Sequence, residues 1–443
     1  MELMPEKDSS HSLKVAICLP DLRLMHKVIH GESSEAMFIT QHYIADGLRK
    51  RGYVLNFLGP YHPDEVVFTG DVDVRVPAQQ TWTSSPLFNL ASKAAWRIQR
   101  LLRIPYLNVF SNYRLLDACL QSFPGHDLVY ERNGLHRYGV AMACKRLGIP
   151  YILFFEADDI LERDVMKLPL SRLLRLQANW AIRYNLKAAD CVICLSEPLK
   201  NYVIGKWEIP AEKIIVLPLA ADIQRFRPDP DSREKIRESL GLGTDPIIIF
   251  VGNFYAWHDV ATLLKAFVQV LETHPDAHLV LVGDGTTRQA MKQLADDLNI
   301  AHAVIFTGMV AHRDVPHYIA AADIAVVPYP VLKQDVWFSP LKLFEYMATG
   351  TAVIASNVGQ LSEWVSDGRS GMLLPPEDVS ALTNAIVRLI DDPALRLRLG
   401  QKAREEIMGK YSWEHYIEQL DKLFISVSRE RSVDVVNENL PLK

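Results

Sequence analysis

The sequence predicts an α/β protein with two doubly wound domains, and two observations carry this prediction. Short apolar runs alternate with amphipathic helical stretches along most of the chain, which is typical of βαβ units and parallel sheets. The chain has 443 residues, whereas a single hydrophobic core seldom serves more than about 250 to 300 residues. We therefore expect a second core.

The apolar runs give the expected strands in order. In the first half they are KVAICLP, YVLNFLGP, DLVYER, PYILFFEA, CVICLS and IIVLPLA, separated by helical stretches such as EAMFITQHYIADGLRKRG. In the second half they are PIIIFVG, HLVLVGDG, VIFTG, IAVVPY, AVIAS and GMLLPP, with helices such as DVATLLKAFVQVLET between them. Each half thus repeats the pattern of a parallel sheet.

Residues 221 to 246 are rich in charge and proline, and they separate the two series of strands. Such a stretch indicates a domain boundary. We expect one domain over 1–221 and another over 222–411. A C-terminal helix over about 412–430 is expected to pack back on the first domain, and 431–443 to form a tail.

Composition places the protein among ordinary globular proteins, with 49% hydrophobic and 23% charged residues and a net charge of −5. This charge balance does not favour nucleic acid. No run reaches the roughly 18 apolar residues of a membrane span, and the N-terminus lacks the order of a signal peptide, so we expect a cytoplasmic location. Cys191 and Cys194 lie three apart in an expected buried strand, which favours core cysteines over zinc ligands.

Ligands of open parallel sheets bind beyond the carboxyl ends of the strands. Four expected strands of the second half are each followed by a loop that could bind a ligand through side chains or backbone groups. Each loop alone could be an ordinary turn. Together, these four loops could build a nucleotide site: Asn253 to Asp259 with His258, Gly283 to Gly285, Met309 with Val310, and the segment leading to Trp337, Phe338 and Ser339.

Residues 338–356, FSPLKLFEYMATGTAVIAS, predict a short helix. Ser339 suits its N-cap, Pro340 its first position and Gly350 its left-handed end. Lys342 would lie in the first turn, against the positive end of the helix dipole, which makes sense if an anion docks there. Lys342 and Glu345 could instead form a mutual salt bridge; alternatively, Lys342 holds a diphosphate while Glu345 accepts both hydroxyls of a ribose.

Residues 246 to about 415 resemble the retaining glycosyltransferases of family 4, which have the GT-B fold of two Rossmann-like domains facing each other across a cleft. The matching blocks are FVGNFYAWHDVATLLKAF, HLVLVGDG, VIFTGMV, ADIAVVPY, SPLKLFEYMATGTAVIAS, GQLSEWVSDGRSGMLLPPED and DDPALRLRLGQKAREE. The first half resembles the family more loosely, in DLVYERNGLHRYGVAMACKRLGIPYILFFEADD and IIVLPLAADIQRF. The resemblance implies an N-terminal acceptor domain and a C-terminal nucleotide-sugar donor domain.

The resemblance also implies residue roles at the donor site. Glu345 corresponds to the second glutamate of the E-x7-E signature, which holds the ribose. The segment from Phe338 and Ser339 through Pro340 to Leu341 would cradle the diphosphate, and the backbone near Val310 would meet the nucleobase. In the loop after KVAICLP, Gly31 would be the remaining member of a glycine pair that faces the diphosphate.

Three positions depart from the family. Asn253 and His258 stand where the family has the Arg and Lys that grip the diphosphate, and Trp337 stands in place of the first signature glutamate. Lys342 and the helix N-terminus would then neutralise the leaving group, with His258 contributing when it is protonated. The loss of the first glutamate leaves recognition of the donor sugar open.

Arg132 and Glu156 follow two strands of the first domain at positions that face the cleft in the family. Glu156 could orient an acceptor hydroxyl, or it could form a structural pair with Arg132. Asp71 and Asp73 have DxD spacing but are interpreted as a solvated loop, since GT-B enzymes generally lack that motif. We expect catalysis by Glu156, Arg132 and Lys342, with no metal and no cofactor other than the sugar nucleotide.

Two further stretches mix Trp, Leu and Arg at helical spacing: TWTSSPLFNLASKAAWRIQRLLR and KLPLSRLLRLQANWAIRYNLK. They suit ordinary surface helices with long basic side chains. The alternative is contact with an anionic membrane or with a phosphate-bearing acceptor. The expected acceptor is a glycan, a lipid-linked molecule or a small molecule.

The sequence therefore favours a metal-independent glycosyltransferase that moves a sugar from a nucleoside diphosphate sugar to an acceptor hydroxyl with retention of configuration. A GT-B-like epimerase or phosphorylase is an alternative, against which the SPLKLFEYMATG block argues. A non-catalytic nucleotide-sugar binding protein is another alternative, suggested by Asn253, His258 and Trp337. The nucleobase, the sugar and the acceptor are not identified by these patterns.

Overall fold

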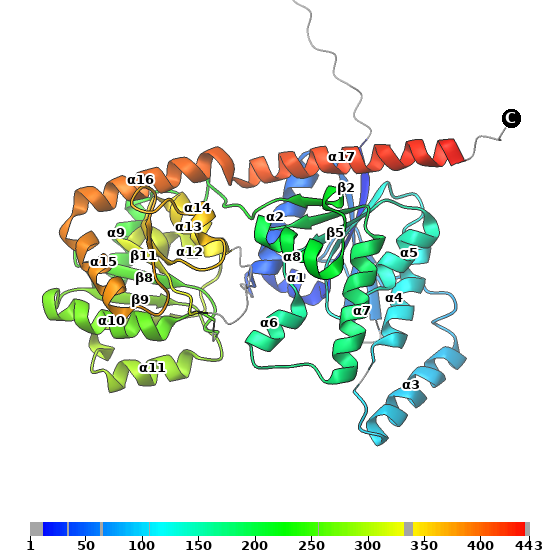
Figure 1. Cartoon of the computed structure of the whole chain (residues 1–443), viewed down its shortest axis with the longest axis horizontal. Helices are drawn as coiled ribbons and strands as arrows, with labels where there is room; N and C mark the ends of the chain where they lie inside the picture. The colour runs from blue at the N-terminus through cyan, green and yellow to red at the C-terminus, as the bar shows by residue number, and fades with distance from the viewer. Residues whose placement is uncertain are drawn as a thin grey trace, which may run out of the picture.

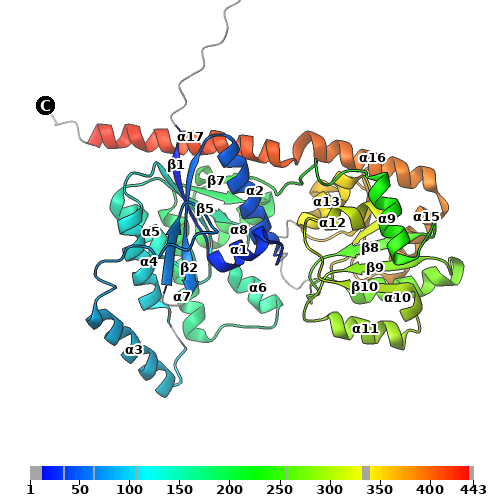
Figure 2. The same ribbon diagram turned by 180° about the vertical axis from the view of Figure 1, so that it is seen from behind.

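The chain forms two α/β units, and its last two helices run one after the other along the same side of the molecule, the first along the C-terminal unit and the second along the N-terminal unit (Figure 1). The computed structural model describes residues 12–32, 35–62, 65–105, 107–255, 257–331 and 340–438, with side chains to residue 429. Figure 2 shows from behind that the two sheets belong to separate units and that their edges do not pair.

The N-terminal unit contains a seven-stranded sheet of order β3-β2-β1-β4-β5-β6-β7. All neighbours pair in parallel except β2 and β3. Its strands are β1 (Lys14–Cys18), β2 (Val54–His62), β3 (Glu65–Thr69), β4 (Leu128–Arg132), β5 (Tyr151–Phe155), β6 (Cys191–Cys194) and β7 (Ile214–Val216). Its helices are α1 (Leu22–Ile29), α2 (Ala36–Lys50), α3 (Pro86–Leu101), α4 (Val109–Ser122), α5 (Gly139–Leu147), α6 (Asp159–Val165), α7 (Arg172–Ala188), α8 (Glu197–Trp207) and the 3₁₀ turn η1 (Ala211–Lys213).

The C-terminal unit contains a parallel six-stranded sheet of order β10-β9-β8-β11-β12-β13. Its strands are β8 (Ile247–Val251), β9 (His278–Val282), β10 (Val304–Gly308), β11 (Ile324–Val327), β12 (Ala352–Ser356) and β13 (Met372–Leu374). Its helices are α9 (Pro230–Leu240), α10 (Val260–Thr273), α11 (Arg288–Asp297), η2 (Ala301–Ala303), α12 (Val315–Ala321), α13 (Leu341–Thr349), α14 (Leu361–Trp364), α15 (Val379–Asp391) and α16 (Pro393–Lys410). The predicted fold class, two doubly wound α/β domains, is confirmed.

Helices cover both faces of each sheet, as buried parallel strands require. In the N-terminal unit, α1, α2 and the final helix α17 (Trp413–Glu438) pack on one face, and α4, α5, α7 and α8 pack on the other. In the C-terminal unit, α12, α13 and α16 lie on one face, and α10, α11 and α15 on the other. All five cysteines are free and buried, Cys191 and Cys194 among them on β6.

The chain crosses between the units twice, and the two crossings are hydrogen-bonded to each other. The amide of Ala221 donates to the carbonyl of Tyr411 over 2.9 Å, and the amide of Trp413 donates to the carbonyl of Ala221 over 3.2 Å. From there α17 packs on α2 of the N-terminal unit. Gly47 permits this close approach, because a Cβ at that position would lie 2.4 Å from Ile417 Cγ1.

Three local features differ from the expectations. An antiparallel strand, β3, extends the first sheet. The segment after β1, expected as a loop, contains helix α1, because the Asp21 side chain accepts hydrogen bonds from two amides of its first turn while Leu22 and Met25 are buried. The last helix ends at Glu438 instead of near residue 430.

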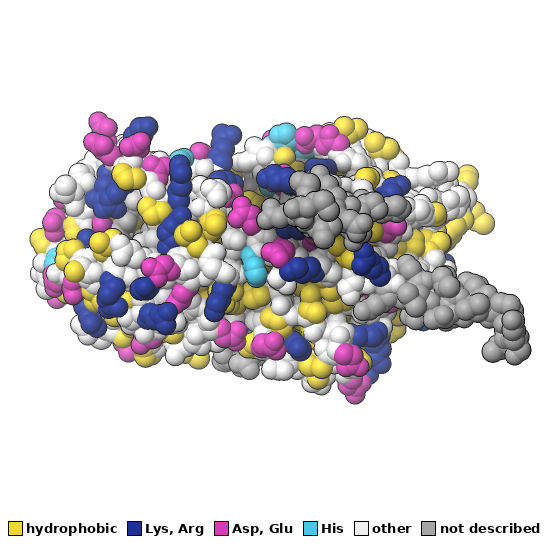
Figure 3. All heavy atoms as spheres, turned by 90° about the horizontal axis from the view of Figure 1, so that it is seen from above, with side chains coloured by type: hydrophobic (Ala, Val, Ile, Leu, Met, Phe, Trp, Pro, Cys, Tyr) yellow, Lys and Arg dark blue, Asp and Glu magenta, His cyan; other side chains and the backbone are white. Residues whose placement is uncertain are grey.

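On the surface that carries α16 and α17, basic and acidic side chains are interspersed over the described residues (Figure 3). Among the described residues, no helix has the length and apolarity needed to cross a membrane.

Candidate functional site

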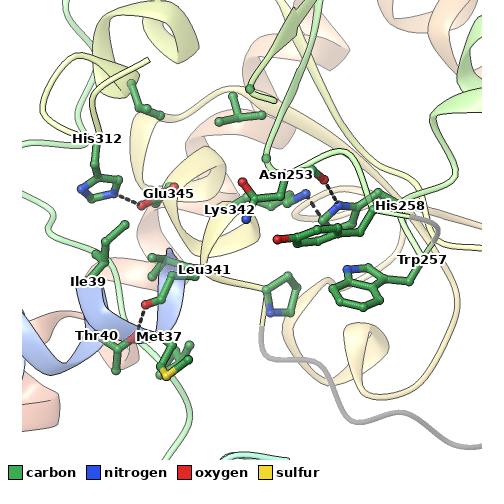
Figure 4. A pocket seen from close by; sticks show the side chains of 18 of the residues that line it. Met37, Ile39, Thr40, Asn253, Trp257, His258, His312, Leu341, Lys342 and Glu345 are labelled. Carbon is green, nitrogen blue, oxygen red and sulfur yellow. Dashed lines mark hydrogen bonds and ion pairs between the residues drawn. The ribbon is translucent and has the colours of Figure 1, made fainter. Parts of the chain in front are cut away.

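A cavity of about 270 Å³ lies between the two units, at the carboxyl ends of strands from both sheets. The start of α2, Glu156 and Glu162 contribute the wall from the N-terminal unit. The loops after β8 and β10 and the start of α13 contribute the opposite wall. Figure 4 shows the side chains that face this space.

Helix α13 presents its N-terminal turn to the cavity. Pro340 is its N-cap, one position later than expected, and Gly350 ends it with φ of 75°, as predicted. The buried Tyr346 hydroxyl accepts a hydrogen bond of 2.6 Å from the amide of Val251 at the end of β8. This bond fixes the helix relative to the strand, and with it the two polar side chains of the first turns.

Lys342 extends into the wall of the cavity toward β8. Its Nζ lies 3.2 Å from His258 Nε2 and 4.2 Å from the centre of the Phe250 ring. Gly252 leaves room for it, because a Cβ there would lie 2.5 Å from Nζ. Burial lowers the pKa of Lys342 to about 7, an effect that the nearby Glu345 only partly opposes.

His258 serves as the acceptor for Lys342. Its Nδ1 faces the carbonyl of Asn253, so this nitrogen carries the proton and Nε2 is left to accept from the Lys342 ammonium (Figure 4). Burial, and then the charge of Lys342, hold the pKa of His258 well below its usual range. The neutral form is therefore favoured in this arrangement, in which His258 offers Lys342 a lone pair; the expectation that it contributes when protonated stays a prediction.

Glu345, one turn further along α13, is only 4% exposed. Its Oε1 lies 2.7 Å from Nε2 of His312, which comes from the loop after β10. Among the ion pairs of the described residues, none joins Lys342 to Glu345. The salt-bridge interpretation of the spacing is thus wrong, since each of the two side chains has a histidine from a different loop as its partner.

The N-terminal wall is acidic. Arg132 Nη2 donates to Glu156 Oε1 over 2.6 Å, so the structural pair exists, while Glu156 also lines the cavity. Burial, together with the neighbouring carboxylates of Asp159 and Glu156, raises the pKa of Glu162 to about 8. Burial also raises the pKa of Asp159 to about 7, against the opposing charge of Arg132. Glu162 is therefore largely protonated at neutral pH.

The cavity brings most of the predicted site residues together. Its lining includes Glu156, Asn253, His258, Val310, Pro340, Leu341, Lys342 and Glu345. Arg132 lies behind Glu156, and Gly31 lies outside the lining, where a Cβ would approach Ala311 Cβ to 3.8 Å. Trp337, Phe338 and Ser339, which were also predicted as site residues, lie outside the described residues.

Sequence reasoning missed His312 and Glu162. The first lies four residues after Gly308, the end of β10, where the same rule that selected Val310 could have selected it. The second follows YILFFEADD within helix α6. Met37, Ile39 and Thr40 of α2 also line the cavity, and no motif marked them.

Two family models match the chain. Residues 232–406 match the model described as glycosyl transferases group 1, and residues 39–220 match the glycosyl transferase 4-like domain. The two matched segments coincide with the bodies of the C-terminal and N-terminal units.

The chain is similar to named transferases of other organisms. It is 26% identical over 279 residues to the alpha-D-kanosaminyltransferase of Streptomyces kanamyceticus, covering 63% of this chain and 71% of that protein. It is 30% identical over 238 residues to a GDP-mannose-dependent alpha-(1-6)-phosphatidylinositol monomannoside mannosyltransferase of Mycolicibacterium smegmatis, covering 53% of this chain and 62% of that protein.

A solved structure has the same arrangement of both units. The Anabaena protein HepE, in complex with UDP and glucose, superimposes with a TM-score of 0.66 at 18% identity. The superposition covers 94% of this chain and 100% of that one. The likeness therefore extends over the folds of both units.

Proposed function

This chain has the GT-B fold and carries two domains that match glycosyltransferase families, and from that premise we propose that it transfers a sugar from a nucleoside diphosphate sugar to an acceptor hydroxyl with retention of configuration. A GDP-mannose-dependent relative and a structural neighbour that holds UDP and glucose support a donor of this class.

The proposal rests chiefly on Lys342. A lysine ammonium that borders a cavity, at a helix N-terminus, with a neutral imidazole as its acceptor, lacks the carboxylate that would normally balance it. A diphosphate would supply the missing negative charge, and the amides of the first turn of α13 would add donors. The pKa of Lys342 is lowered because burial without a paired anion disfavours its charged form.

In the proposed reaction, the bond between the anomeric carbon and the diphosphate oxygen breaks, and the acceptor oxygen attacks the same face of the sugar. Lys342 and the α13 amides stabilise the charge that develops on the leaving oxygen, which then takes the acceptor proton. The positive charge comes from the protein, and we therefore propose that transfer requires no metal ion.

Glu345 would bind the ribose of the donor. Its carboxylate is buried and already oriented by His312, so two hydroxyl donors could bind with little reorganisation. The acceptor would bind on the opposite wall. There Glu156, held by Arg132, can accept from an acceptor hydroxyl, and protonated Glu162 can donate to an acceptor oxygen.

The test is incubation of the purified chain with a panel of nucleoside diphosphate sugars, first without and then with candidate acceptors, in excess chelator. We expect slow release of nucleoside diphosphate from one donor, and NMR should show a product that keeps the anomeric configuration. Lys342→Met is the control and should abolish release.

Three other outcomes would favour the alternatives. Binding without any release would favour a non-catalytic binding protein. Release of a free epimerised sugar would favour an epimerase, and dependence on added phosphate would favour a phosphorylase.

We further propose that the enzyme contacts an anionic membrane through α3, at the outer corner of the N-terminal unit (Figures 1 and 2). Only Ser92 of this helix is buried. An apolar stripe at intervals of three or four residues faces solvent, with Leu87 77% and Leu101 82% exposed at its two ends: Leu87, Leu90, Ala94, Ile98 and Leu101.

Charge favours a membrane as the partner of this stripe. Lys93, Arg97 and Arg100 follow at intervals of four and three and lie exposed, Arg103 is exposed just beyond the helix, and the helix contains no acidic residue. Basic side chains beside an exposed apolar stripe are typical of helices that lie at an anionic bilayer surface. Leu173, Leu176 and Trp180 of α7 are also exposed and add apolar surface to the same unit. A lipid-linked acceptor would suit this arrangement.

A further inference from the structure

We propose that His26, His30 and Asp73 form a binding site for a divalent transition metal ion of the zinc class, separate from the donor cavity. The ligand atoms of the three side chains all lie within 4.8 Å of one another. None of these residues lines the cavity.

Two of the three separations between ligand atoms are near those of a loaded site. His30 Nε2 lies 2.9 Å and His26 Nε2 lies 3.8 Å from the same oxygen, Oδ1 of Asp73. In a tetrahedral site with metal–ligand bonds of about 2.0 to 2.1 Å, neighbouring ligands are about 3.3 to 3.4 Å apart. The observed separations fall on either side of that value, so small side-chain rotations would equalise them around an ion.

Helix α1 and the loop after β3 hold the three side chains close together. His26 lies on α1 and His30 is the C-cap of that helix, four residues further on, so the two rings lie side by side with centroids 4.4 Å apart. The Asp71 carboxylate accepts a hydrogen bond of 3.0 Å from the amide of Asp73, which orients the loop that presents the third ligand. Asp71, interpreted from the sequence together with Asp73 as part of a solvated loop, thus supports Asp73 and is not itself a proposed ligand.

The donor set selects the class of metal. Two imidazoles and one carboxylate suit Zn²⁺ and its neighbours, whereas Mg²⁺ prefers oxygen ligands only. His30 and Asp73 are exposed and His26 is half-buried, so water can complete the coordination. Such an ion would join α1 to the loop after β3, and it would fix His30 next to Gly31, which faces Ala311 of the C-terminal unit.

The test is calorimetric titration of the chelator-stripped, full-length chain with Zn²⁺ in a buffer that does not bind metal. We expect one equivalent to bind and the melting temperature to rise. His26→Gln, His30→Gln and Asp73→Asn should each weaken binding by about tenfold or more. His302→Gln, which changes an exposed histidine of the C-terminal unit, is the matched control and should bind as the unchanged chain does.

Two further measurements keep the result clear. Melting without metal should be the same for all variants, which shows that they fold. Co²⁺ in place of Zn²⁺ should give the visible absorption of a four-coordinate site in the unchanged chain and in His302→Gln only. The proposal is overturned if the unchanged chain takes up no Zn²⁺, or if the three ligand variants bind it within twofold of the unchanged chain; the cluster is then an ordinary histidine–aspartate hydrogen bond. Neither outcome depends on transferase activity.

Discussion

His312 Nε2 lies 2.7 Å from Glu345 Oε1, and this pair links the α13 wall of the cavity to the boundary between the units. The carbonyl of His312 accepts a hydrogen bond from Arg225 Nη2. Nη1 of the same guanidinium donates to the hydroxyl of Tyr43 on α2, over 2.8 Å. The position of the buried carboxylate therefore depends on groups from both units.

Replacing Glu345 by Gln should weaken donor binding without unfolding the chain. Each charge-assisted hydrogen bond to the ribose is worth about 1.5 to 3 kcal/mol, so the Kd for the nucleoside diphosphate should rise about tenfold or more. His312→Gln should produce a smaller rise, because it loosens the carboxylate without removing it. Titration with a nucleoside diphosphate and with its dideoxyribose analogue measures both effects.

The analogue is the diagnostic ligand for this prediction. The unchanged chain should bind it more weakly than the ribose form, and Glu345→Gln should bind the two equally. His317→Gln is the control, since that histidine bonds to Ser232 outside the cavity lining. Equal preference for ribose in all three variants would place the ribose elsewhere.

Replacing Lys342 by Met should stabilise the fold while it removes activity. The pKa of Lys342 is about 7 in the folded chain and 10.5 in a free lysine. At pH 7 the folded state therefore carries a penalty that Met lacks, on the order of 1 to 4 kcal/mol after allowance for solvent. Urea unfolding at pH 7 measures the gain, and donor turnover measures the loss. A destabilised variant would argue that the lysine has a structural role.

The sign of the pH dependence follows from the same shift. Between pH 7 and 10.5 the unfolded chain binds the proton that folded Lys342 has released, so this group makes stability rise with pH over that interval. Lys342→Met should lack that rise. Unfolding midpoints measured at intervals across this range, for the unchanged chain and the variant, provide the check.

Donor binding should follow the opposite trend. A diphosphate favours the ammonium form, so the affinity for a nucleoside diphosphate should be highest below pH 7 and fall by up to tenfold per unit above it. Calorimetry in two buffers of different ionisation enthalpy should detect proton uptake on binding. Lys342→Met should show neither the fall nor the uptake attributable to this group.

Changing Arg97, Arg100 and Arg103 to Glu should release the protein from anionic liposomes. Each basic side chain near such a surface contributes about 1 kcal/mol, and salt screens the attraction. Sedimentation with phosphatidylserine-containing vesicles gives the bound fraction. The control makes the same charge change in the C-terminal unit, at Lys235, Lys265 and Lys410, all exposed. Equal loss in both triple variants would indicate a general charge effect, and concentration-dependent self-association without liposomes would assign α3 to a second copy of the chain.

The parallel strands were predictable because strands buried on both faces are continuous apolar runs, whereas the antiparallel strand β3 was missed. The short helix around Lys342 and Glu345 was predictable too, since Pro340 and Gly350 bound it and its apolar residues repeat at helical spacing. These are local properties of the chain.

The partners of these charges were not predictable in the same way. His258 and Lys342 are 84 residues apart, and His312 and Glu345 are 33 apart. These pairs form because the loops after β8 and β10 both fold over α13. The hydrophobic periodicity of the sequence does not predict the positions of those loops. The His30–Asp73 contact spans 43 residues and relies on α1, whose Asp21 cap was present in the sequence but was taken as part of a loop.

The hydrogen bonds of Ala221 with Tyr411 and Trp413 make the C-terminal unit a topological insertion. Both of its connections leave the N-terminal unit at one point, so residues 222–411 form a cassette whose two ends are already adjacent. An exchange of this cassette between related chains would need to preserve only that short bridge and the surface facing α2. Under the proposed function, such an exchange would separate nucleotide preference, assigned to the C-terminal unit, from acceptor preference, assigned to the N-terminal unit.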